Sequence, residues 1–540
     1  MKAKSLLLTV LTAVLFTGCS DSEGDSPDPS MIGRAFLSLS LQSTTGPSTK
    51  ATGSIEEKPG TSDESTAGEV KVLLFDEHDL CLGVVPVTGA TIGNSSGDGN
   101  PTAEATDAIA VPPKTAKVFV VINPYTTGWD FTEDKVKNKT WDEINTTLTD
   151  AKIENVTTDK KFMMASAGYE KATDKSVTYK GALTDVTTNV KIPKDYTPEE
   201  IKTAKTAAKA LPAVVNVDRL ASKVTVTKAA EADFTIAPTG AKFTFQGWEL
   251  SVTNKSVRLY SDLVSYDNKT TGAVYRRDNN YMENEQPKNP NGLRTAFDYL
   301  KNIDSYEVSE EIPEVKRASA ANAYCLENTM EAVAQQLGFT TKVVVKAQYT
   351  PNGIAENTSY FSWNGKYYTL TTLKEEYNKD GSGLKTDLPI FLHKAKLMED
   401  GVFNGADQDE KNKVVAELTA EKFTEKTGII GRYCAVRYYH ESVCYYDVLI
   451  RHDKNITQKM ALGRWGVVRN NWYSIELKSV TGPGTPWIPD PSDPDPTDPT
   501  QPDPDNPTDP DIDDDENDAY LSVKITINPW TFWTQEANLH

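Results

Sequence analysis

The chain has 540 residues, of which 38% are hydrophobic and 25% are charged, so it is long enough for roughly two to four domains and apolar enough to bury a core. Its formal net charge of −20 argues against nucleic acid as a partner. Thirteen acidic residues and no Lys or Arg fall within residues 489–518, so this one segment carries most of the negative charge.

The N-terminus has the pattern of an export signal. Lys2 and Lys4 precede an apolar run, Leu6–Phe16, which is too short to cross a bilayer. The run ends at Cys19 in a sequence that resembles the lipobox of bacterial lipoproteins, in which the cysteine is acylated and becomes the first mature residue. We therefore expect residues 1–18 to be a signal peptide and Cys19 to be the lipidation site.

The first predicted strand follows a polar tether. In residues 35–42, Leu37, Leu39 and Leu41 alternate with polar side chains, a period of two that predicts a half-buried strand. Residues 43–68 are rich in Thr, Ser, Gly and Glu, which predicts a flexible loop accessible to proteases. We expect residues 19–50 to form a propeptide that contains this strand.

Two β-rich units follow, at residues 51–215 and 216–482, where short strands alternate with turn signals. Two helices interrupt the first unit, with predicted caps at Thr140 and Thr197. The dipeptide Asn364-Gly365 predicts a tight hairpin in the second unit. The predicted strands include residues 70–75, 117–122, 176–179, 223–227, 242–248, 342–349 and 472–480.

Side chains that could take part in catalysis, metal binding or disulfide formation are scattered along the sequence. Cys434 and Cys444 flank a predicted hairpin, where they either form a disulfide or pack as two thiols. The chain has no C-x-x-C pair and no hydrolase, zinc-protease or P-loop motif. We interpret the tyrosines at 438, 439, 445 and 446 as strand packing rather than a sugar platform, and we predict no enzymatic activity, no cofactor and no metal site.

The C-terminal end carries a second isolated amphipathic strand. Residues 483–518 repeat Asp-Pro, which predicts an extended, semi-rigid spacer. In residues 519–540, Leu521, Val523, Ile525 and Ile527 alternate with polar residues and precede Trp530. Such a strand suits addition to the sheet of another copy, where ladder hydrogen bonds and apolar pockets hold it. The alternative is that it folds back into its own domain.

Together, the two end strands suggest an assembly mechanism. The N-terminal strand would plug a groove in the precursor, and a protease would remove it. The C-terminal donor strand of another copy would then take its place, and a head-to-tail contact of this kind builds a filament.

The sequence resembles a known family, the fimbrillins or type V pilins, and specifically the shaft subunit of the minor fimbria. The most specific matches are Val467–Tyr473 (VVRNNWY), the Asp-Pro spacer and Leu521–Trp530. The resemblance implies a mostly β fold with two tandem transthyretin-like β-sandwich domains, a few short helices, an extended linker and a donor strand. It also implies an outer-membrane lipoprotein precursor, proteolytic activation, and a fimbrium that mediates adhesion and colonisation. The implied partners are other copies, anchor and tip subunits, an activating surface protease, and host or bacterial surface ligands.

The sequence offers two candidate positions for the cleavage. The family's protease usually cuts after an arginine in the loop that follows the first strand, and here that loop contains Lys50-Ala51 and no arginine. Arg34-Ala35 lies before the strand, where cutting would still release the lipid. We favour Lys50. The alternative function is a monomeric surface lipoprotein that binds glycans or host proteins and keeps Cys19 in its mature form.

Overall fold

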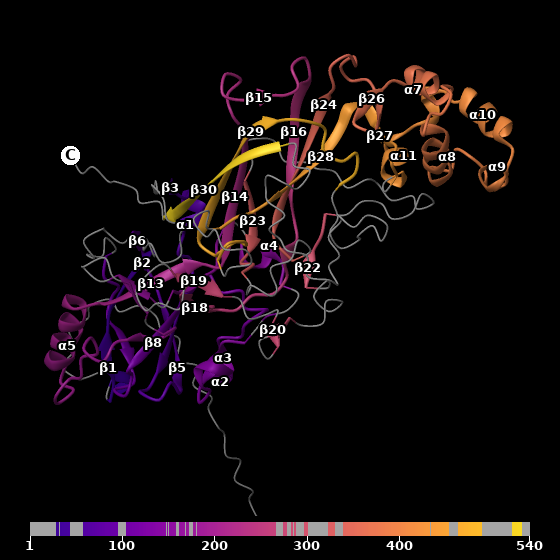
Figure 1. The fold of residues 1–540 in the computed structure, drawn as a ribbon. Coiled ribbons are helices and arrows are strands. Elements are labelled where there is room, and N and C mark those ends of the chain that lie inside the picture. The colour runs from indigo at the N-terminus through magenta and orange to yellow at the C-terminus, as the bar shows by residue number, and fades with distance from the viewer. Residues whose placement is uncertain are drawn as a thin grey trace, which may run out of the picture.

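A computed structural model describes most of the two β-rich units, and within this part the chain is mostly β with short helices, as predicted (Figure 1). The described residues are 29–31, 33–43, 58–94, 104–146, 148, 151–157, 161–167, 169–171, 177–179, 181–265, 274–277, 282–283, 286–287, 296–300, 322–329, 339–431, 434–452, 463–488 and 521–531. No helix in these ranges is both long and apolar enough to cross a membrane.

The N-terminal unit is built on an eight-stranded mixed sheet with an apolar core on each face. Its order is β5 (Cys81–Val87), β4 (Val70–Phe75), β8 (Lys117–Ile122), β9 (Met164–Ser166), β13 (Ala213–Arg219), β2 (Leu39–Ser43) and β6 (Ile92–Asn94), with β12 (Thr184–Asp185) also paired to β8. The predicted strands 70–75 and 117–122 are confirmed. Val, Leu and Phe side chains fill both faces of these strands, which is typical of central strands.

The C-terminal unit is a sandwich of two sheets. One sheet has the order β23 (Asn322–Leu326), β14 (Ala221–Lys228), β29 (Asn471–Val480), β30 (Leu521–Thr531) and β3 (Lys58–Pro59), with β15 (Thr235–Ile236) also on β29. The facing sheet has the order β16 (Lys242–Ser251), β24 (Lys342–Thr350) and β28 (Val443–Leu449). Alternate side chains of both sheets fill the core between them, including Val224, Val345 and Ile475.

The chain passes between the two units at Leu220, which separates β13 from β14. The predicted boundary between residues 215 and 216 therefore falls inside β13 and is wrong by a few positions. The physical reason is that β13 is one continuous strand, whose Val217 pairs with Ser166 and Ser43 of the N-terminal sheet.

Smaller elements surround these sheets. The predicted caps are present, because Thr140 closes a capping box on α3 (Trp141–Ile144) and Thr197 accepts a hydrogen bond at the start of α5 (Pro198–Ala210), where Pro198 is the first residue. The remaining small elements are α1 (Ser62–Ser65), α2 (Glu133–Val136), α3 (Trp141–Ile144), α4 (Ile153–Val156), α5 (Pro198–Ala210), and the pairs β1 (Ala35–Leu37) with β7 (Ile109–Val111), β10 (Tyr169–Lys171) with β11 (Val177–Tyr179), β17 (Thr253–Asn254) with β22 (Phe297–Asp298), β18 (Asp262–Ser265) with β19 (Val274–Arg277), and β20 (Met282–Glu283) with β21 (Gln286–Pro287).

A helical insertion projects from one end of the C-terminal sandwich (Figure 1, orange). The strand and turn signals of the sequence did not predict it. It follows the hairpin at Asn364-Gly365, where both residues have positive φ as the predicted turn requires. Its helices pack around a separate aromatic core that includes Phe361, Phe391 and Tyr438. The elements are β25 (Tyr360–Trp363), β26 (Lys366–Tyr368), α7 (Leu370–Tyr377), α8 (Leu384–Lys394), α9 (Asp400–Asn404), α10 (Gln408–Ala416), α11 (Glu425–Ile430) and β27 (Arg437–Tyr439).

Candidate functional site

The N-terminal strand lies inside its unit and is not half-buried. β2 pairs in parallel with β13 on one edge and with β6 on the other, and β1 pairs with β7. Every residue from Ala35 to Leu41 is at most 1% exposed. The prediction that Ser38 and Ser40 face solvent is therefore wrong, and these small polar side chains lie in the interior.

The physical reason is that other segments cover the polar face of this strand. The Ser38 hydroxyl donates to the carbonyl of Thr106, and the Thr106 hydroxyl accepts from the backbone N–H of Leu39 at 3.0 Å. Further along, the Gln42 amide donates to Asn216 Oδ1 at 2.9 Å. Small hydroxyls and an amide are tolerated in an interior where hydrogen-bond partners are fixed.

The helix α5 covers the start of the same strand (Figure 1). Phe36 packs against Ile201, Ala204 and Ala208 on the buried face of α5, and the Lys205 ammonium lies 5.4 Å from the centre of its ring. The Leu37, Leu39 and Leu41 side chains face the opposite core. Burying four such apolar side chains stabilises the strand by on the order of 6–12 kcal/mol before entropy costs.

The C-terminal strand β30 lies on the body of its own chain, side by side with β29 (Figure 1, yellow). The two strands pair antiparallel from Val480 opposite Leu521 to Asn471 opposite Pro529. In the single chain, the expectation of a strand far from its own globular part is therefore wrong, and the fold-back alternative describes it. The physical reason is that the edge of β29 supplies ladder hydrogen bonds and an apolar face within the same chain.

The predicted alternation of β30 is confirmed where its side chains are described. Leu521 is buried, Val523 and Ile525 are half-buried against the sandwich core, and Ser522 and Lys524 are exposed. For two further predicted residues the register alone is described: Ile527 lies opposite Tyr473, and Trp530 lies opposite Lys58 of β3. β30 thus has β29 on one edge and, at its end, β3 on the other.

The two end strands occupy two different places in the fold. The place of β2, here called the N-terminal slot, is doubly buried in the eight-stranded sheet, whereas the place of β30, here called the C-terminal slot, leaves one face of the strand in solvent. A strand that moved from the C-terminal slot to the N-terminal slot would therefore bury more of its surface. This difference in burial is the structural basis for the function proposed below.

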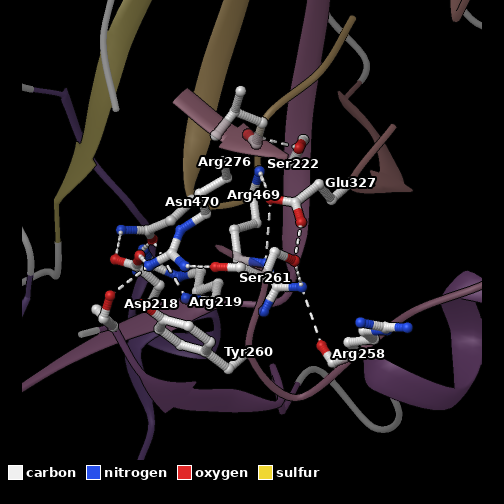
Figure 2. A network of polar contacts seen from close by, with 12 residues as sticks. Asp218, Arg219, Ser222, Arg258, Tyr260, Ser261, Arg276, Glu327, Arg469 and Asn470 are labelled. Atoms are coloured by element: carbon white, nitrogen blue, oxygen red, sulfur yellow. Dashed lines mark hydrogen bonds and ion pairs between the residues drawn. The ribbon is translucent and has the colours of Figure 1, made fainter. Parts of the chain in front are cut away.

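A buried polar network joins the two units (Figure 2). Arg276 donates to Asp218 Oδ2 at 2.8 Å, the Asn470 amide donates to Asp218 Oδ1 at 2.9 Å, and Arg219 Nη1 donates to Asn470 Oδ1 at 3.0 Å. Beside them, Arg469 Nε lies 3.2 Å from Glu327 Oε2. The members of this network are Asp218, Arg219, Arg276, Glu327, Arg469 and Asn470.

Burial and the neighbouring carboxylates act in opposite directions on the pKa values of the arginines in this network. Burial lowers the pKa of Arg219 to about 9 despite the attraction of Glu64 and Asp218. Burial also opposes the charge of Arg276, but the charges of Asp218 and Glu327, with Tyr260 and the hydrogen bond to Asp218, together outweigh it and raise the pKa of that guanidinium. This network is not predicted from the sequence, although Arg469 and Asn470 lie in the run Val467–Tyr473 that carries the family resemblance. Charged residues next to buried strand positions are the signal that could have indicated it.

The structure also places the other predicted residues. Cys19, Lys50 and Ala51 lie outside the described residues. Arg34 is exposed immediately before the buried strand β1.

The two cysteines of the predicted hairpin are buried and are thiols outside any disulfide, so the interpretation as two thiols is confirmed. Cys434 lies in the core of the helical insertion and Cys444 in the core of the sandwich, so they face different interiors. Burial raises the pKa of Cys444 to about 11. The tyrosines at 438, 439, 445 and 446 are buried, as the packing interpretation predicts. Among the described residues, no group of three His, Cys, Asp or Glu side chains is arranged to hold a metal.

Two family models match this chain. The model for the major fimbrial subunit protein (FimA) matches residues 35–206, and the model for the C-terminal part of fimbrillin, a major fimbrial subunit protein of type IV, matches residues 437–536. Together they cover about half of the chain and include both end strands. The protein is thus a subunit of a bacterial cell-surface fimbria. It belongs to the fimbrillin family, as the resemblance predicts.

Solved structures give a weaker comparison. A candidate cell adhesion protein from Parabacteroides distasonis ATCC 8503 is 12% identical, with 93% of this chain and 99% of that chain covered and a TM-score of 0.39. The fimbrilin FimA from Porphyromonas gingivalis W83 is 13% identical, with coverage of 93% and 98% and a TM-score of 0.36. The tip fimbrial protein Mfa3 from Porphyromonas gingivalis is 10% identical, with coverage of 92% and 100% and a TM-score of 0.34. No curated protein matches the chain.

Proposed function

We propose that this fimbrial subunit is a shaft subunit of a minor fimbrium that polymerises by strand exchange. The precursor is exported as a lipoprotein acylated at Cys19 and is held at the outer membrane. A surface protease then cuts it between Lys50 and Ala51 and frees the N-terminal strand. The C-terminal strand of a second copy enters the N-terminal slot, and repetition of this step builds the filament.

The observation that carries this proposal is the double burial of the N-terminal strand. Ala35–Leu41 fills an interior position of the N-terminal unit. Among the described residues, β2 is nevertheless the first strand of its sheet in chain order, and the segment that contains Lys50 follows it. Cleavage after Lys50 would leave the strand with no covalent link to the rest of the sheet. Cleavage after Arg34 would release the lipid but leave the strand in its slot, which is why we favour Lys50.

The pattern of β30 suits the N-terminal slot in part. Leu521, Val523 and Ile525 supply the alternating apolar side chains that Leu37, Leu39 and Leu41 supply in the precursor. Lys524 is the residue that fits least, because an unpaired buried ammonium is strongly destabilising. With this matching Lys524 takes the position of the buried Ser40, so its long side chain has to reach water past the segments that cover that face.

The role is structural rather than catalytic, and it requires no cofactor. The partners are other copies of the chain, the anchor and tip subunits of the fimbrium, the activating protease, and the host or bacterial surface ligands to which the fimbria adhere during colonisation.

Sequencing the N-terminus of sheared surface protein tests the proposal directly. A start at Ala51 supports it, and an acylated Cys19 in assembled filaments contradicts it. In the same strain, deletion of residues 520–540 should leave export and folding intact and abolish filaments, while Lys50→Ala should leave unpolymerised lipidated precursor. Arg34→Ala is the matched control and should leave maturation unchanged.

The second candidate function is a monomeric surface lipoprotein that binds glycans or host proteins. The self-pairing of β30 with β29 favours it, since a closed chain needs no neighbour to cover its C-terminal slot. The mass of the mature protein in solution separates the two functions. A single-chain mass for protein released from cells, together with Cys19 at its N-terminus, would establish the monomer.

A further inference from the structure

The segment that follows the predicted cleavage loop is built into the C-terminal sheet. Residues 58–65, here called the strap, comprise β3 and the short helix α1. The composition of residues 43–68 predicts a flexible loop, and for residues 58–65 that prediction is wrong. Lys58 and Pro59 pair in parallel with Trp530 and Thr531, so the strap borders the end of the C-terminal strand.

The strap is anchored by a buried carboxylate. Glu64 is 2% exposed, and its carboxylate accepts hydrogen bonds from Lys223 Nζ at 2.8 Å and from the Tyr324 hydroxyl. The same carboxylate accepts from the backbone N–H of Thr61 at 2.7 Å, which closes a capping box on α1. Burial works to raise the pKa of Glu64, but the hydrogen bonds from Lys223, Tyr324 and Thr61, together with the positive charge of Lys223, outweigh it and hold that pKa below its ordinary value.

The anchor also reaches the buried polar network. Arg219 Nε donates to the carbonyl of Glu64 at 2.8 Å, and Arg219 Nη1 donates to Asn470, the residue directly before β29. The Lys223 ammonium lies 3.9 Å from the ring centre of Trp472 on β29. One residue of the strap, Glu64, therefore contacts β14 and β23 through its side chain and reaches the end of β13, and through it the start of β29, by its backbone carbonyl.

Two different segments, β29 and β3, pair with the two edges of β30. β29 pairs along most of the strand, whereas β3 pairs at its C-terminal end. For β30 to leave, its ladder with β3 must break as well. That ladder is short, and α1 keeps it in place through Glu64.

We propose that the strap is an intramolecular lock that holds the C-terminal strand on its own sheet until it is transferred to a second copy, with Glu64 as its positioning residue. The proposal rests on the proposed strand exchange but concerns a separate step, the opening of the donor. The strap follows Lys50 in the chain, so cleavage there removes the N-terminal strand and leaves the lock in the mature subunit. Opening of the donor is therefore a barrier to assembly that proteolysis alone does not remove.

Amide hydrogen exchange on the full-length precursor measures the lock. In Glu64→Gln we expect exchange of residues 521–531 to quicken by about tenfold, equivalent to about 1.4 kcal/mol, relative to residues 117–122 of β8. Thr61→Ala removes the cap without leaving a buried charge unpaired, and should give a smaller change in the same direction. The control is Asp447→Asn, which breaks the Lys342–Asp447 ion pair on the facing sheet and should leave residues 521–531 unchanged.

Assembly after proteolytic removal of the N-terminal strand gives the second readout. Faster filament growth in Glu64→Gln, with faster exchange in β30, supports the lock. Faster exchange in β30 without filaments from any variant, wild type included, supports the lock and contradicts strand exchange. Unchanged exchange in β30 in both Glu64→Gln and Thr61→Ala overturns the lock and leaves the proposed function standing.

Discussion

Arg219 and Asn470 lie 251 positions apart in the sequence, yet Arg219 Nη1 donates to Asn470 Oδ1 at 3.0 Å in the interior. Arg219 ends β13 of the N-terminal sheet, and Asn470 precedes β29 of the C-terminal sandwich. Asp218 binds the amide of the same asparagine at 2.9 Å. The two units are therefore joined by hydrogen bonds at the ends of their central strands, close to both slots.

The first prediction concerns this junction. Asn470→Ala should destabilise the chain by about 1–3 kcal/mol, because Asp218 and Arg219 each lose a buried hydrogen-bond partner. Denaturant unfolding of the purified precursor measures the change in free energy. Asn470 has a φ of 59°, a left-handed value that alanine disfavours.

The control for that variant is Asn470→Gly, which tolerates the same φ and also lacks the amide. If Gly restores the wild-type free energy of unfolding, backbone conformation explains the loss and the hydrogen bonds do not.

The second prediction concerns the N-terminal strand. Leu39→Ala should lower the free energy of unfolding of the precursor by about 2–5 kcal/mol, because it leaves a cavity in a fully buried position. Thermal or denaturant unfolding measures it. Ile390→Ala, at a 37% exposed position on α8, is the control and should change little. An equal effect of the two substitutions would contradict the interior placement of the strand.

The third prediction uses a covalent link between β29 and β30. Glu476 and Lys524 are register partners, and Lys524 is exposed. Side chains directly opposite in an antiparallel pair lie close enough for a disulfide. Glu476→Cys combined with Lys524→Cys should block filament formation when oxidised and permit it when reduced, as seen by electron microscopy.

The matched control for this experiment is Glu476→Ser with Lys524→Ser, which should assemble equally in both conditions. Normal filaments from the oxidised cysteine pair would mean that β30 does not need to leave β29.

The fourth prediction is a pH dependence set by Glu64. Its folded pKa lies below its ordinary value of 4.5, so its ionised form stabilises the strap above about pH 4.5. This stabilisation is lost as the pH falls through the lowered folded pKa. Hydrogen exchange of β30, corrected for intrinsic rates, should therefore quicken in acid in the wild type and respond less in Glu64→Gln. Parallel acid responses in the two chains would contradict a role for this carboxylate.

Local sequence signals predicted local structure well. The Thr140 capping box, the proline that starts α5 and the Asn364-Gly365 turn each depend on neighbouring residues, and each is present. The helical insertion was missed even though Thr369 caps α7, because the surrounding strand pattern dominated the interpretation of this region. The charged anchor at Glu64 was missed because its partners come from three distant strands.

The sequence by itself determined which side chains of each end strand are apolar, since a period of two fixes one face of any strand. The tertiary structure decided where each strand pairs and whether its other face meets water. Ser38 is buried because distant segments cover it, and β30 lies beside β29 because that edge is available within the chain. The physical reason is that every peptide group offers the same donor and acceptor, so alternation specifies a face but never selects the edge to which a strand binds.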